Sequence, residues 1–410
     1  MRKIVHSLWP LFFGLSLMML GNGLQGTLLG VRATIEDFNT TSTGFIMSLY
    51  YLGFVFGSYF APKLVKNVGH IRVFTALASL ASVTVLLHGV IVDIWFWAFI
   101  RVFTGFSYAG LYIVVESWLN DASTNKTRGK ILALYQVISY GGMVGGQFLL
   151  TTADPATVTL FILTSVLVSI ALIPISLSSR PAPSFDEPEH ISLKKLFSMS
   201  PTGIICAFGS GMSASIILGL GAVYAIEIGL PLAQIPTFIA IYLLGGVLFQ
   251  IPIGWLSDRY NRRTILILIC FLSCIISLGC FLASGGSLLF YILFFLLGGC
   301  SLSIYGQCLA HTNDHIAPRY FVAAGSSLIL VNGVGAALGP LIVSIFMTVL
   351  SIEVYFLSLT VLFFIIFAYG LYRTQRSPSI PLEDQGEAII MPARSAAIEL
   401  NITEDTPQDS

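Results

Sequence analysis

Long, uninterrupted apolar runs constrain this chain more than any other feature of its sequence. A run of about 18 or more apolar residues with few charges is long enough to cross the roughly 30 Å hydrocarbon layer of a membrane. Helices are expected, because backbone groups in lipid must be satisfied internally and these runs lack the alternation of barrel strands. The twelve predicted spans are about 9–30, 43–62, 72–92, 95–117, 131–152, 157–178, 202–226, 234–256, 264–283, 288–309, 322–349 and 354–372.

The distribution of basic residues supports both the number of spans and their orientation. With both termini in the cytoplasm, 18 of the 20 Lys and Arg residues fall in cytoplasmic segments, while Arg32 lies outside and Arg101 lies within a span. Cytoplasmic loops of membrane proteins carry the excess of Lys and Arg. We therefore expect a multi-pass protein of the bacterial plasma (inner) membrane with both termini cytoplasmic.

A polar segment rich in proline and charge divides the spans into six and six. We predict an N-terminal six-helix bundle (1–178), a cytoplasmic linker (179–201), a C-terminal six-helix bundle (202–373) and a disordered cytoplasmic tail (374–410). A shift of 193 positions also aligns Gly105 with Gly298, among other matches. Parallel repeats of this kind occur in transporters, with the substrate site between them, although chance similarity between hydrophobic helices is the alternative.

The stretch "GWLSDRYNRR" (254–263) concentrates charge in a chain that is 56% hydrophobic and 10% charged. It follows span 234–256 on the cytoplasmic side, where Gly254 permits a close helix contact and Asp258 ends the helix. Arg259, Arg262 and Arg263 are expected to remain in water. A plain positive-inside anchor is the alternative, but an anchor would need no aspartate at this position.

This stretch resembles the loop signature of the major facilitator superfamily, G-x-L-x-D-R-x-x-R-R, and Arg101-x-x-x-Gly105 is similar to that family's fourth-span motif. The stretch "VVESWLN" further resembles a bacterial YcaD-like branch. The resemblance covers about residues 8–373 and implies an all-α fold of twelve transmembrane helices in two six-helix bundles that transports by alternating access. It also implies a cytoplasmic gate formed by Gly254, Asp258, Arg259, Arg262 and Arg263, in which the charges contact a neighbouring helix end. The equivalent first-half loop departs from the signature, with Lys66 at the acidic position.

Polar side chains within the spans predict a cavity for a small organic solute. An ionisable side chain at the bilayer centre costs roughly 2.5–3.5 kcal/mol, so it should face a cavity or a partner. Tyr108 and Tyr112 share a helix face with Arg101, and amides lie on faces of other spans. Amides and tyrosines can bind a polar solute, although they could equally join helices by hydrogen bonds. The predicted cavity residues are Asn22, Gln25, Arg101, Tyr108, Tyr112, Gln136, Tyr140, Gln147, Tyr224, Tyr242, Gln250, Tyr305 and Asn332.

Two carboxylates are candidates for proton coupling. Glu116 is the only carboxylate on the polar face of span 95–117, and burial would move its pKa from about 4.3 towards neutrality. Glu227 lies near the outer end of span 202–226. For each residue, a simple interfacial position is the alternative. Arg101 stays protonated, so its predicted role is charge compensation or substrate contact.

Small residues four positions apart predict close helix packing. Gly142 and Gly146 form one such pair, and Gly335 and Gly339 form another that is followed by Pro340. This spacing allows helix backbones to approach one another, and the proline can bend its helix. The glycine–proline stretch is similar to a motif of the family's antiporters, which slightly favours export, but the direction of transport stays open.

The sequence favours a secondary active transporter, and we predict that its transport is coupled to protons. It carries no G-x-x-x-x-G-K-[ST] nucleotide cradle, and we expect no enzyme activity, cofactor, metal site or nucleic-acid partner. The expected partners are a small-molecule solute, the bilayer and protons, with a monomer as the functional unit. A uniporter on the same fold and a non-transporting membrane receptor are the alternatives.

Overall fold

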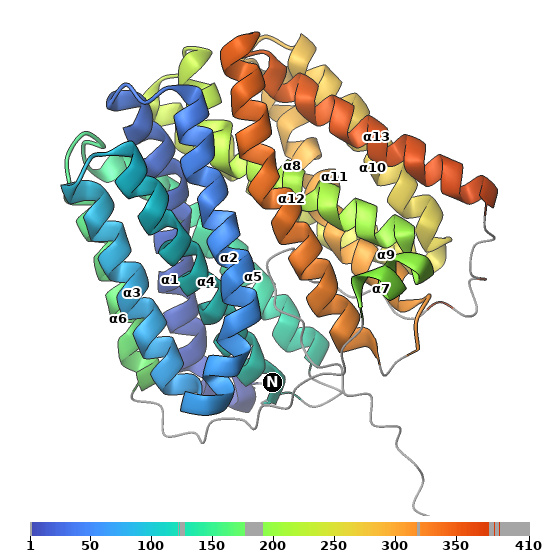
Figure 1. The fold of residues 1–410 in the computed structure, drawn as a ribbon, viewed down its shortest axis with the longest axis horizontal. Coiled ribbons are helices and arrows are strands. Elements are labelled where there is room, and N and C mark those ends of the chain that lie inside the picture. The colour runs from blue at the N-terminus through green and yellow to red at the C-terminus, as the bar shows by residue number, and fades with distance from the viewer. Residues whose placement is uncertain are drawn as a thin grey trace, which may run out of the picture.

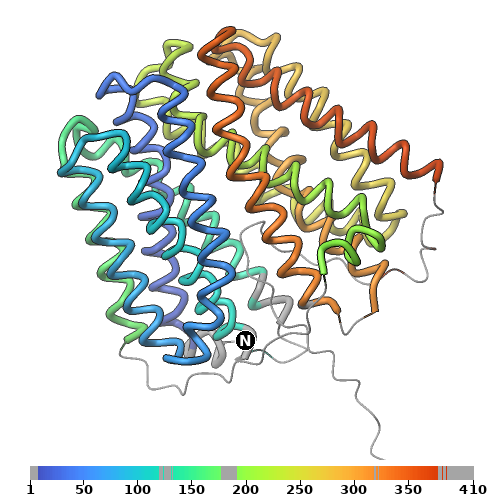
Figure 2. The backbone as a smooth tube through the Cα atoms, in the orientation of Figure 1, coloured from blue at the N-terminus to red at the C-terminus, as the bar shows by residue number. Residues whose placement is uncertain are grey.

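A computed structural model describes residues 2–121, 123, 128–176, 192–317, 320–376, 381 and 385. Within these residues the secondary structure consists of thirteen α-helices and two short 3-10 helices. Eleven of the helices are long and apolar enough to cross a membrane. The helix α5 (Arg128–Phe148) lies outside that set and packs against the first of them. Figures 1 and 2 show two adjacent helical bundles, with the first half of the chain in one and the second half in the other. The predicted all-α fold is confirmed.

The first bundle contains six long helices. In it α1 packs against α5 and α6, α3 packs against α4 and α6, and α2 packs against α4. The bounds are α1 (Arg2–Ile35), α2 (Thr40–Val68), α3 (His70–Val90), α4 (Ile94–Asp121), α5 (Arg128–Phe148) and α6 (Thr159–Ser176), with the 3-10 helix η1 (Leu149–Thr152) after α5.

The second bundle repeats this arrangement. Here α8 packs against α12, α9 against α11, and α10 against α11 and α13. The bounds are α8 (Pro201–Glu227), α9 (Ile235–Arg259), α10 (Arg262–Leu282), α11 (Leu288–Asn313), α12 (Phe321–Val349) and α13 (Val354–Arg376), with η2 (Leu232–Gln234) before α9. A short helix, α7 (Leu193–Met199), lies in the segment expected to be a linker. Residues 177–191 of that linker, and the expected tail after 376 apart from 381 and 385, lie outside the described residues.

The sequence repeat corresponds to matching helix contacts in the two bundles. A Cβ atom on Gly105 of α4 would overlap the carbonyl oxygen of Tyr50 in α2, so the two backbones touch. In the second bundle a Cβ atom on Gly298 of α11 would overlap the carbonyl oxygen of Tyr242 in α9. The α2–α4 and α9–α11 pairs are therefore packed through the same kind of contact, in which a glycine lies against the backbone of a tyrosine.

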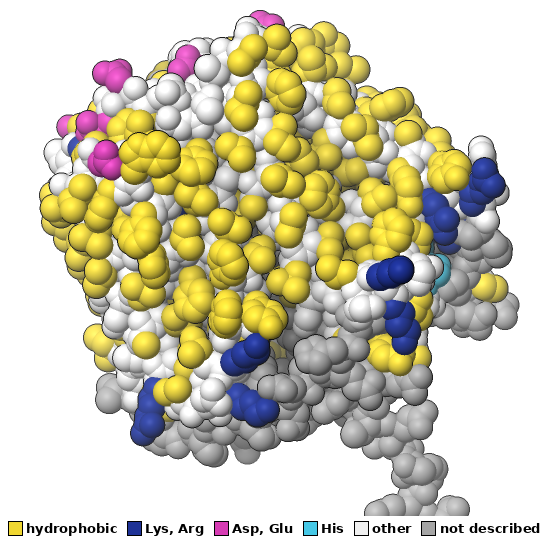
Figure 3. Space-filling model, viewed as in Figure 1, with side chains coloured by type: hydrophobic (Ala, Val, Ile, Leu, Met, Phe, Trp, Pro, Cys, Tyr) yellow, Lys and Arg dark blue, Asp and Glu magenta, His cyan; other side chains and the backbone are white. Residues whose placement is uncertain are grey.

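The two ends of the molecule differ in charge, and we call them the acidic end and the basic end. Asp37, Asp93, Asp154, Glu227 and Glu353 lie at or next to helix connections at the acidic end. Lys63, Lys66, Arg72, Arg259, Arg373 and Arg376 lie at the basic end. In Figure 3 the acidic side chains gather along the upper edge and the basic ones along the lower edge and the right, with an apolar belt between them. This is the surface of a protein that spans a bilayer.

The two bundles contact each other most closely at the acidic end. There the hydroxyl oxygens of Thr41 in α2 and Thr348 in α12 are 2.9 Å apart. One turn further along α2, a Cβ atom on Gly44 would overlap the side chain of Ser344, so α2 and α12 pack backbone to side chain. Towards the basic end α2 and α12 diverge, as Figure 1 shows. The structure therefore has its bundles joined at the acidic end and spread at the basic end.

Candidate functional site

A cavity lies between the two bundles. Helices α1, α2, α4 and α5 of the first bundle form most of its wall, and α8 and α9 of the second bundle complete it. The lining residues are Asn22, Gly23, Gly26, Thr27, Met47, Tyr50, Tyr51, Arg101, Met143, Gln147, Leu218, Gly219 and Ile239.

The cavity lies in the half of the molecule that includes the acidic end. Helix α4 begins at Ile94 at the acidic end, and Arg101 follows seven residues later. At 1.5 Å per residue this places Arg101 about 10 Å along a helix that is about 42 Å long. Between the cavity and the acidic end, α2 and α12 meet at Thr41 and Thr348.

Arg101 brings a buried positive charge to the cavity wall. Its side chain is 5% exposed. The guanidinium carbon lies 4.4 Å from the centre of the Tyr50 ring, and Nη2 donates to the sulfur of Met47 at 3.8 Å. A cation over an aromatic face is attracted by the negative charge of the ring face. Helix α2 therefore fixes the position of the guanidinium, which stays protonated at physiological pH.

Hydrogen bonds between α1 and its neighbours orient the amides of the cavity wall. Gln147 of α5 accepts from the Thr27 hydroxyl and donates from Nε2 to the carbonyl oxygen of Gly23 at 2.9 Å. Asn22 donates from Nδ2 to the Tyr112 hydroxyl oxygen at 3.0 Å. These bonds hold the amide groups in one orientation before any solute binds.

A row of tyrosines, Tyr50 of α2 followed by Tyr108 and Tyr112 of α4, leads from Arg101 towards Glu116. The ring centres of Tyr50 and Tyr108 are 6.4 Å apart, as are those of Tyr108 and Tyr112. Beyond them, Glu116 is 1% exposed and accepts a hydrogen bond of 2.6 Å from the Tyr135 hydroxyl of α5. Glu116 therefore links α4 to α5 through Tyr135.

Three predicted cavity residues, Asn22, Arg101 and Gln147, are among those that line this cavity. The other ten lie outside its lining and are buried in the helix packing. In the second bundle, the Tyr242 hydroxyl lies 3.0 Å from that of Ser301, and Asn332 donates to the Ala207 carbonyl oxygen at 3.0 Å. The remaining eight are Gln25, Tyr108, Tyr112, Gln136, Tyr140, Tyr224, Gln250 and Tyr305.

Several lining residues were not predicted from the sequence. Tyr50 and Tyr51 stand in an α2 helix whose aromatic side chains occur on all sides, so no periodic signal marks them. Leu218 and Ile239 are ordinary apolar residues of a membrane helix. Thr27 carries no such signal either, because it follows Asn22 by five residues, which places the two about 140° apart around the helix.

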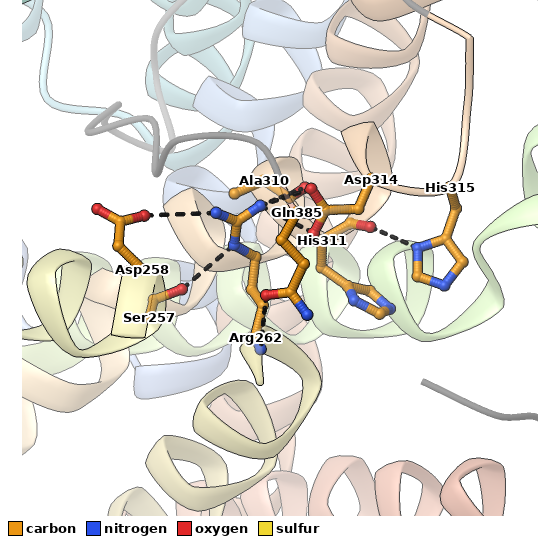
Figure 4. Close-up of polar contacts among 8 residues, drawn as sticks. All are labelled: Ser257, Asp258, Arg262, Ala310, His311, Asp314, His315 and Gln385. Carbon is orange, nitrogen blue, oxygen red and sulfur yellow. Dashed lines mark hydrogen bonds and ion pairs between the residues drawn. The ribbon is translucent and has the colours of Figure 1, made fainter. Parts of the chain in front are cut away.

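The motif at the basic end contains a buried ion pair (Figure 4). Nη1 of Arg262 donates to the two carboxylate oxygens of Asp314, at 2.7 and 2.8 Å, and its Nε donates to the Ser257 hydroxyl at 3.3 Å. Asp258 lies 3.5 Å from Nη2 of the same arginine and its side chain is 44% exposed. These described contacts join α9, α10 and α11, which all belong to the second bundle.

The expectation that the motif's arginines remain in water is wrong for two of the three. Arg262 is 1% exposed and Arg263 is 6% exposed. Arg262 is buried because Asp314, at the end of α11, supplies a carboxylate within the protein. Arg259 is exposed and lies over the Trp255 ring, 4.0 Å from its centre. Gly254 is buried in α9 near this cluster.

The remaining predicted residues lie at helix contacts or on the surface. Gly142 and Gly146 of α5 face α1, and Gly335 and Gly339 of α12 face α8, each at a position where a Cβ atom would meet the other helix. Pro340 lies within α12, and its carbonyl oxygen is close to Gly44 of α2. Glu227 is exposed at the end of α8. Among the described residues, no group of three His, Cys, Asp or Glu side chains could hold a metal ion.

Comparison with known proteins gives consistent matches along most of the chain. The family model described as Major Facilitator Superfamily matches residues 11–330 and 203–402. An uncharacterized MFS-type transporter of Enterobacter sp. (strain 638) is 25% identical over 371 residues, covering 90% of this chain and 96% of the relative. The uncharacterized MFS-type transporter YcaD of Escherichia fergusonii is 24% identical over 374 residues, covering 91% and 97%.

Solved structures share the fold at lower sequence identity. The nucleoside transporter NupG superposes with a TM-score of 0.75 at 12% identity, covering 89% of this chain and 99% of that one. A bacterial homolog of the human lysosomal transporter Spinster, in an inward-facing conformation, also gives 0.75 at 12% identity, covering 94% and 99%. The fucose:proton symporter FucP of E. coli gives 0.58 at 14% identity, covering 90% and 99%.

Proposed function

The chain belongs to the major facilitator superfamily, and we propose that it is a secondary active transporter that moves a small organic solute by alternating access. The observation that carries this proposal is the cavity whose wall is shared by both bundles. When two bundles rock about such a cavity, the same site opens first to one side of the membrane and then to the other. Glycine-mediated contacts at Gly105 and Gly298 lie within each bundle, so each bundle can move as a unit.

The basic end is proposed to face the cytoplasm of a bacterium, across its inner membrane. Cytoplasmic loops carry the Lys and Arg excess, and the described basic side chains gather at that end. In this orientation the described structure has its bundles joined on the outside and spread on the inside, which is an inward-facing arrangement. The protein is proposed to work as a monomer, because one chain supplies both walls of the cavity.

Proton coupling is proposed to pass through Glu116. This carboxylate is buried and receives a hydrogen bond from Tyr135 of α5. Protonation removes its negative charge, so it changes the interaction between α4 and α5. A carboxyl group that is charged in one facing state and neutral in the other links proton movement to solute movement. Glu227 is the weaker candidate, because it is exposed at the acidic end.

Transport by proteoliposomes tests the function and its coupling together. In the wild-type protein, an imposed pH gradient should drive solute accumulation, whereas Glu116→Gln should exchange solute between equal pools without accumulation. Tyr135→Phe removes the hydrogen bond but keeps the carboxyl group, so it should shift the pH dependence and retain accumulation.

Other outcomes would identify the alternatives. Accumulation by Glu116→Gln with the wild-type pH dependence would remove Glu116 from the mechanism. Solute flux that ignores the pH gradient would indicate a uniporter. Ligand binding without any flux would indicate a receptor. The direction of transport, with export slightly favoured by the Gly335–Pro340 stretch, follows from the side on which solute accumulates.

A further inference from the structure

We propose that the solute bound in this cavity is a small organic monocarboxylate, held by Arg101 through its carboxylate and by the second bundle through its apolar part. The inference deepens the proposed function and rests on it for the claim that the ligand is transported. The binding claim stands on the cavity itself.

The charge of the cavity wall selects an anion. Among the described lining residues, Arg101 carries the one charged side chain, and none is a carboxylate. A guanidinium remains protonated in proteins, so the wall repels an ammonium group and attracts an acid. A single cation balances a single negative charge, which favours a monocarboxylate over a doubly charged phosphate or dicarboxylate.

The way Arg101 is held suits recognition of a carboxylate. Its guanidinium lies over the Tyr50 ring at 4.4 Å. A stacked guanidinium keeps its N–H donors in its own plane, and paired donors of this kind bind a carboxylate through both oxygens. Because the ring limits the movement of the guanidinium, less conformational entropy is lost when the anion binds.

The two bundles offer different surfaces to the ligand. The first bundle supplies the polar groups of the wall, including Thr27, Gln147 and Arg101, whereas the second supplies Leu218, Gly219 and Ile239. A ligand with a carboxylate at one end and an apolar body at the other contacts both surfaces. Such a ligand bridges the bundles, and removing it changes how they meet.

Gly26 of α1 provides a way to fill the cavity without disturbing the protein. A Cβ atom built on Gly26 meets no atom within 4 Å, and Gly26 lines the cavity. Gly141 of α5 also has open space at the Cβ position, but it is exposed and lies outside the cavity lining. Gly26→Leu should therefore fill the site, and Gly141→Leu is its matched control for the cost of replacing a helical glycine.

Binding to purified protein tests the ligand class. The probes are acetate, lactate, hexanoate, benzoate and phenylacetate, each compared with its neutral amide, together with phenethylamine as a cation. At least one carboxylate with an apolar body should raise the thermal midpoint and bind tenfold or more tightly than its amide, with no effect of the amine. Arg101→Gln should weaken this binding about tenfold or more, Arg101→Lys should weaken it less, and Gly26→Leu should abolish it while Gly141→Leu retains it.

The inference is overturned if no carboxylate binds, if amides or the amine bind as well as the acids, or if Arg101→Gln leaves affinity unchanged. Flux of the same probes into proteoliposomes separates this inference from the proposed function. A carboxylate that binds through Arg101 without crossing the membrane would refute transport and leave the anion site standing. Flux of a neutral or cationic probe that Arg101→Gln does not slow would refute the anion site and leave transport standing.

Discussion

The ion pair between Arg262 and Asp314 is expected to contribute far more to stability than the pair between Arg262 and Asp258, which lies within the sequence motif. Both side chains of the first pair are almost fully buried, at 1% and 4% exposure, and one guanidinium nitrogen binds both carboxylate oxygens within 2.8 Å. Removing one member of a buried pair costs about 3–5 kcal/mol, because the other charge stays in a poorly solvated site. We therefore expect Asp314→Asn to lower the free energy of unfolding by about 3–5 kcal/mol.

Asp258 serves as the comparison, because it contacts the same arginine under different conditions. Its carboxylate is 44% exposed and lies 3.5 Å from Nη2 of Arg262. Exposed pairs contribute about 0–1 kcal/mol, so Asp258→Asn should lower stability by less than about 1 kcal/mol. Solvent and salt screen this pair, whereas the buried pair is expected to respond little to ionic strength.

Thermal unfolding of the purified variants, followed by tryptophan fluorescence, measures the difference. A further variant replaces both partners, Arg262→Met with Asp314→Leu, which leaves no buried charge in the pair and should recover most of the stability lost in Asp314→Asn. The reasoning is refuted if Asp314→Asn costs no more than Asp258→Asn. It is also refuted if the double replacement is no more stable than the single one.

Two further predictions concern orientation and pH. In a background without native cysteines, Asn39→Cys should react with an impermeant thiol reagent from outside the cell and Lys63→Cys should not. Both positions are exposed, but they lie at opposite ends of the molecule. Labelling of Lys63→Cys from outside would reverse the proposed orientation. His315, which follows α11, has its pKa lowered chiefly by burial and also by the nearby charge of Arg263. Because the unfolded chain then takes up a proton at higher pH than the folded protein, stability should fall as the pH drops below about 6.5. The thermal midpoint of His315→Gln should fall less than that of the wild type between pH 7 and pH 5, and equal slopes would exclude a contribution from His315.

The fold could be predicted from the sequence because each membrane-spanning helix must be long and apolar enough to cross the bilayer, whatever its neighbours are. Span length, the absence of charge and the cytoplasmic Lys and Arg residues are local properties, so they needed no knowledge of tertiary contacts. The offset between the two halves could also be found in the sequence. Gly105 and Gly298 occupy matching positions because at each of them two helix backbones touch and leave no room for a Cβ atom.

The site was only partly predictable, because its geometry depends on contacts between distant residues. Arg101 stood out as a charge inside a span, but its partner Tyr50 lies on another helix and resembles its aromatic neighbours. Asp314 is distant from Arg262 along the chain, so the sequence motif drew attention to Asp258 instead. Amides such as Gln25 and Gln136 have the composition of a polar lining and yet lie outside the cavity that the structure describes.

Alternating access at the cavity is tested most directly by cross-linking α2 to α12 at the acidic end. The measurement is whether a thiol reagent added on each side of the membrane reaches position 26. The hydroxyl oxygens of Thr41 and Thr348 are 2.9 Å apart, so Thr41→Cys with Thr348→Cys should form a disulfide between α2 and α12. A third substitution, Gly26→Cys, reports access to the cavity in a background without native cysteines. With the disulfide reduced, an impermeant thiol reagent should label Gly26→Cys from either side of the membrane. With the disulfide formed, labelling should persist from the basic end and cease from the acidic end, and a reductant should restore it. Labelling from the acidic end at an unchanged rate in the fully oxidised protein would contradict the mechanism.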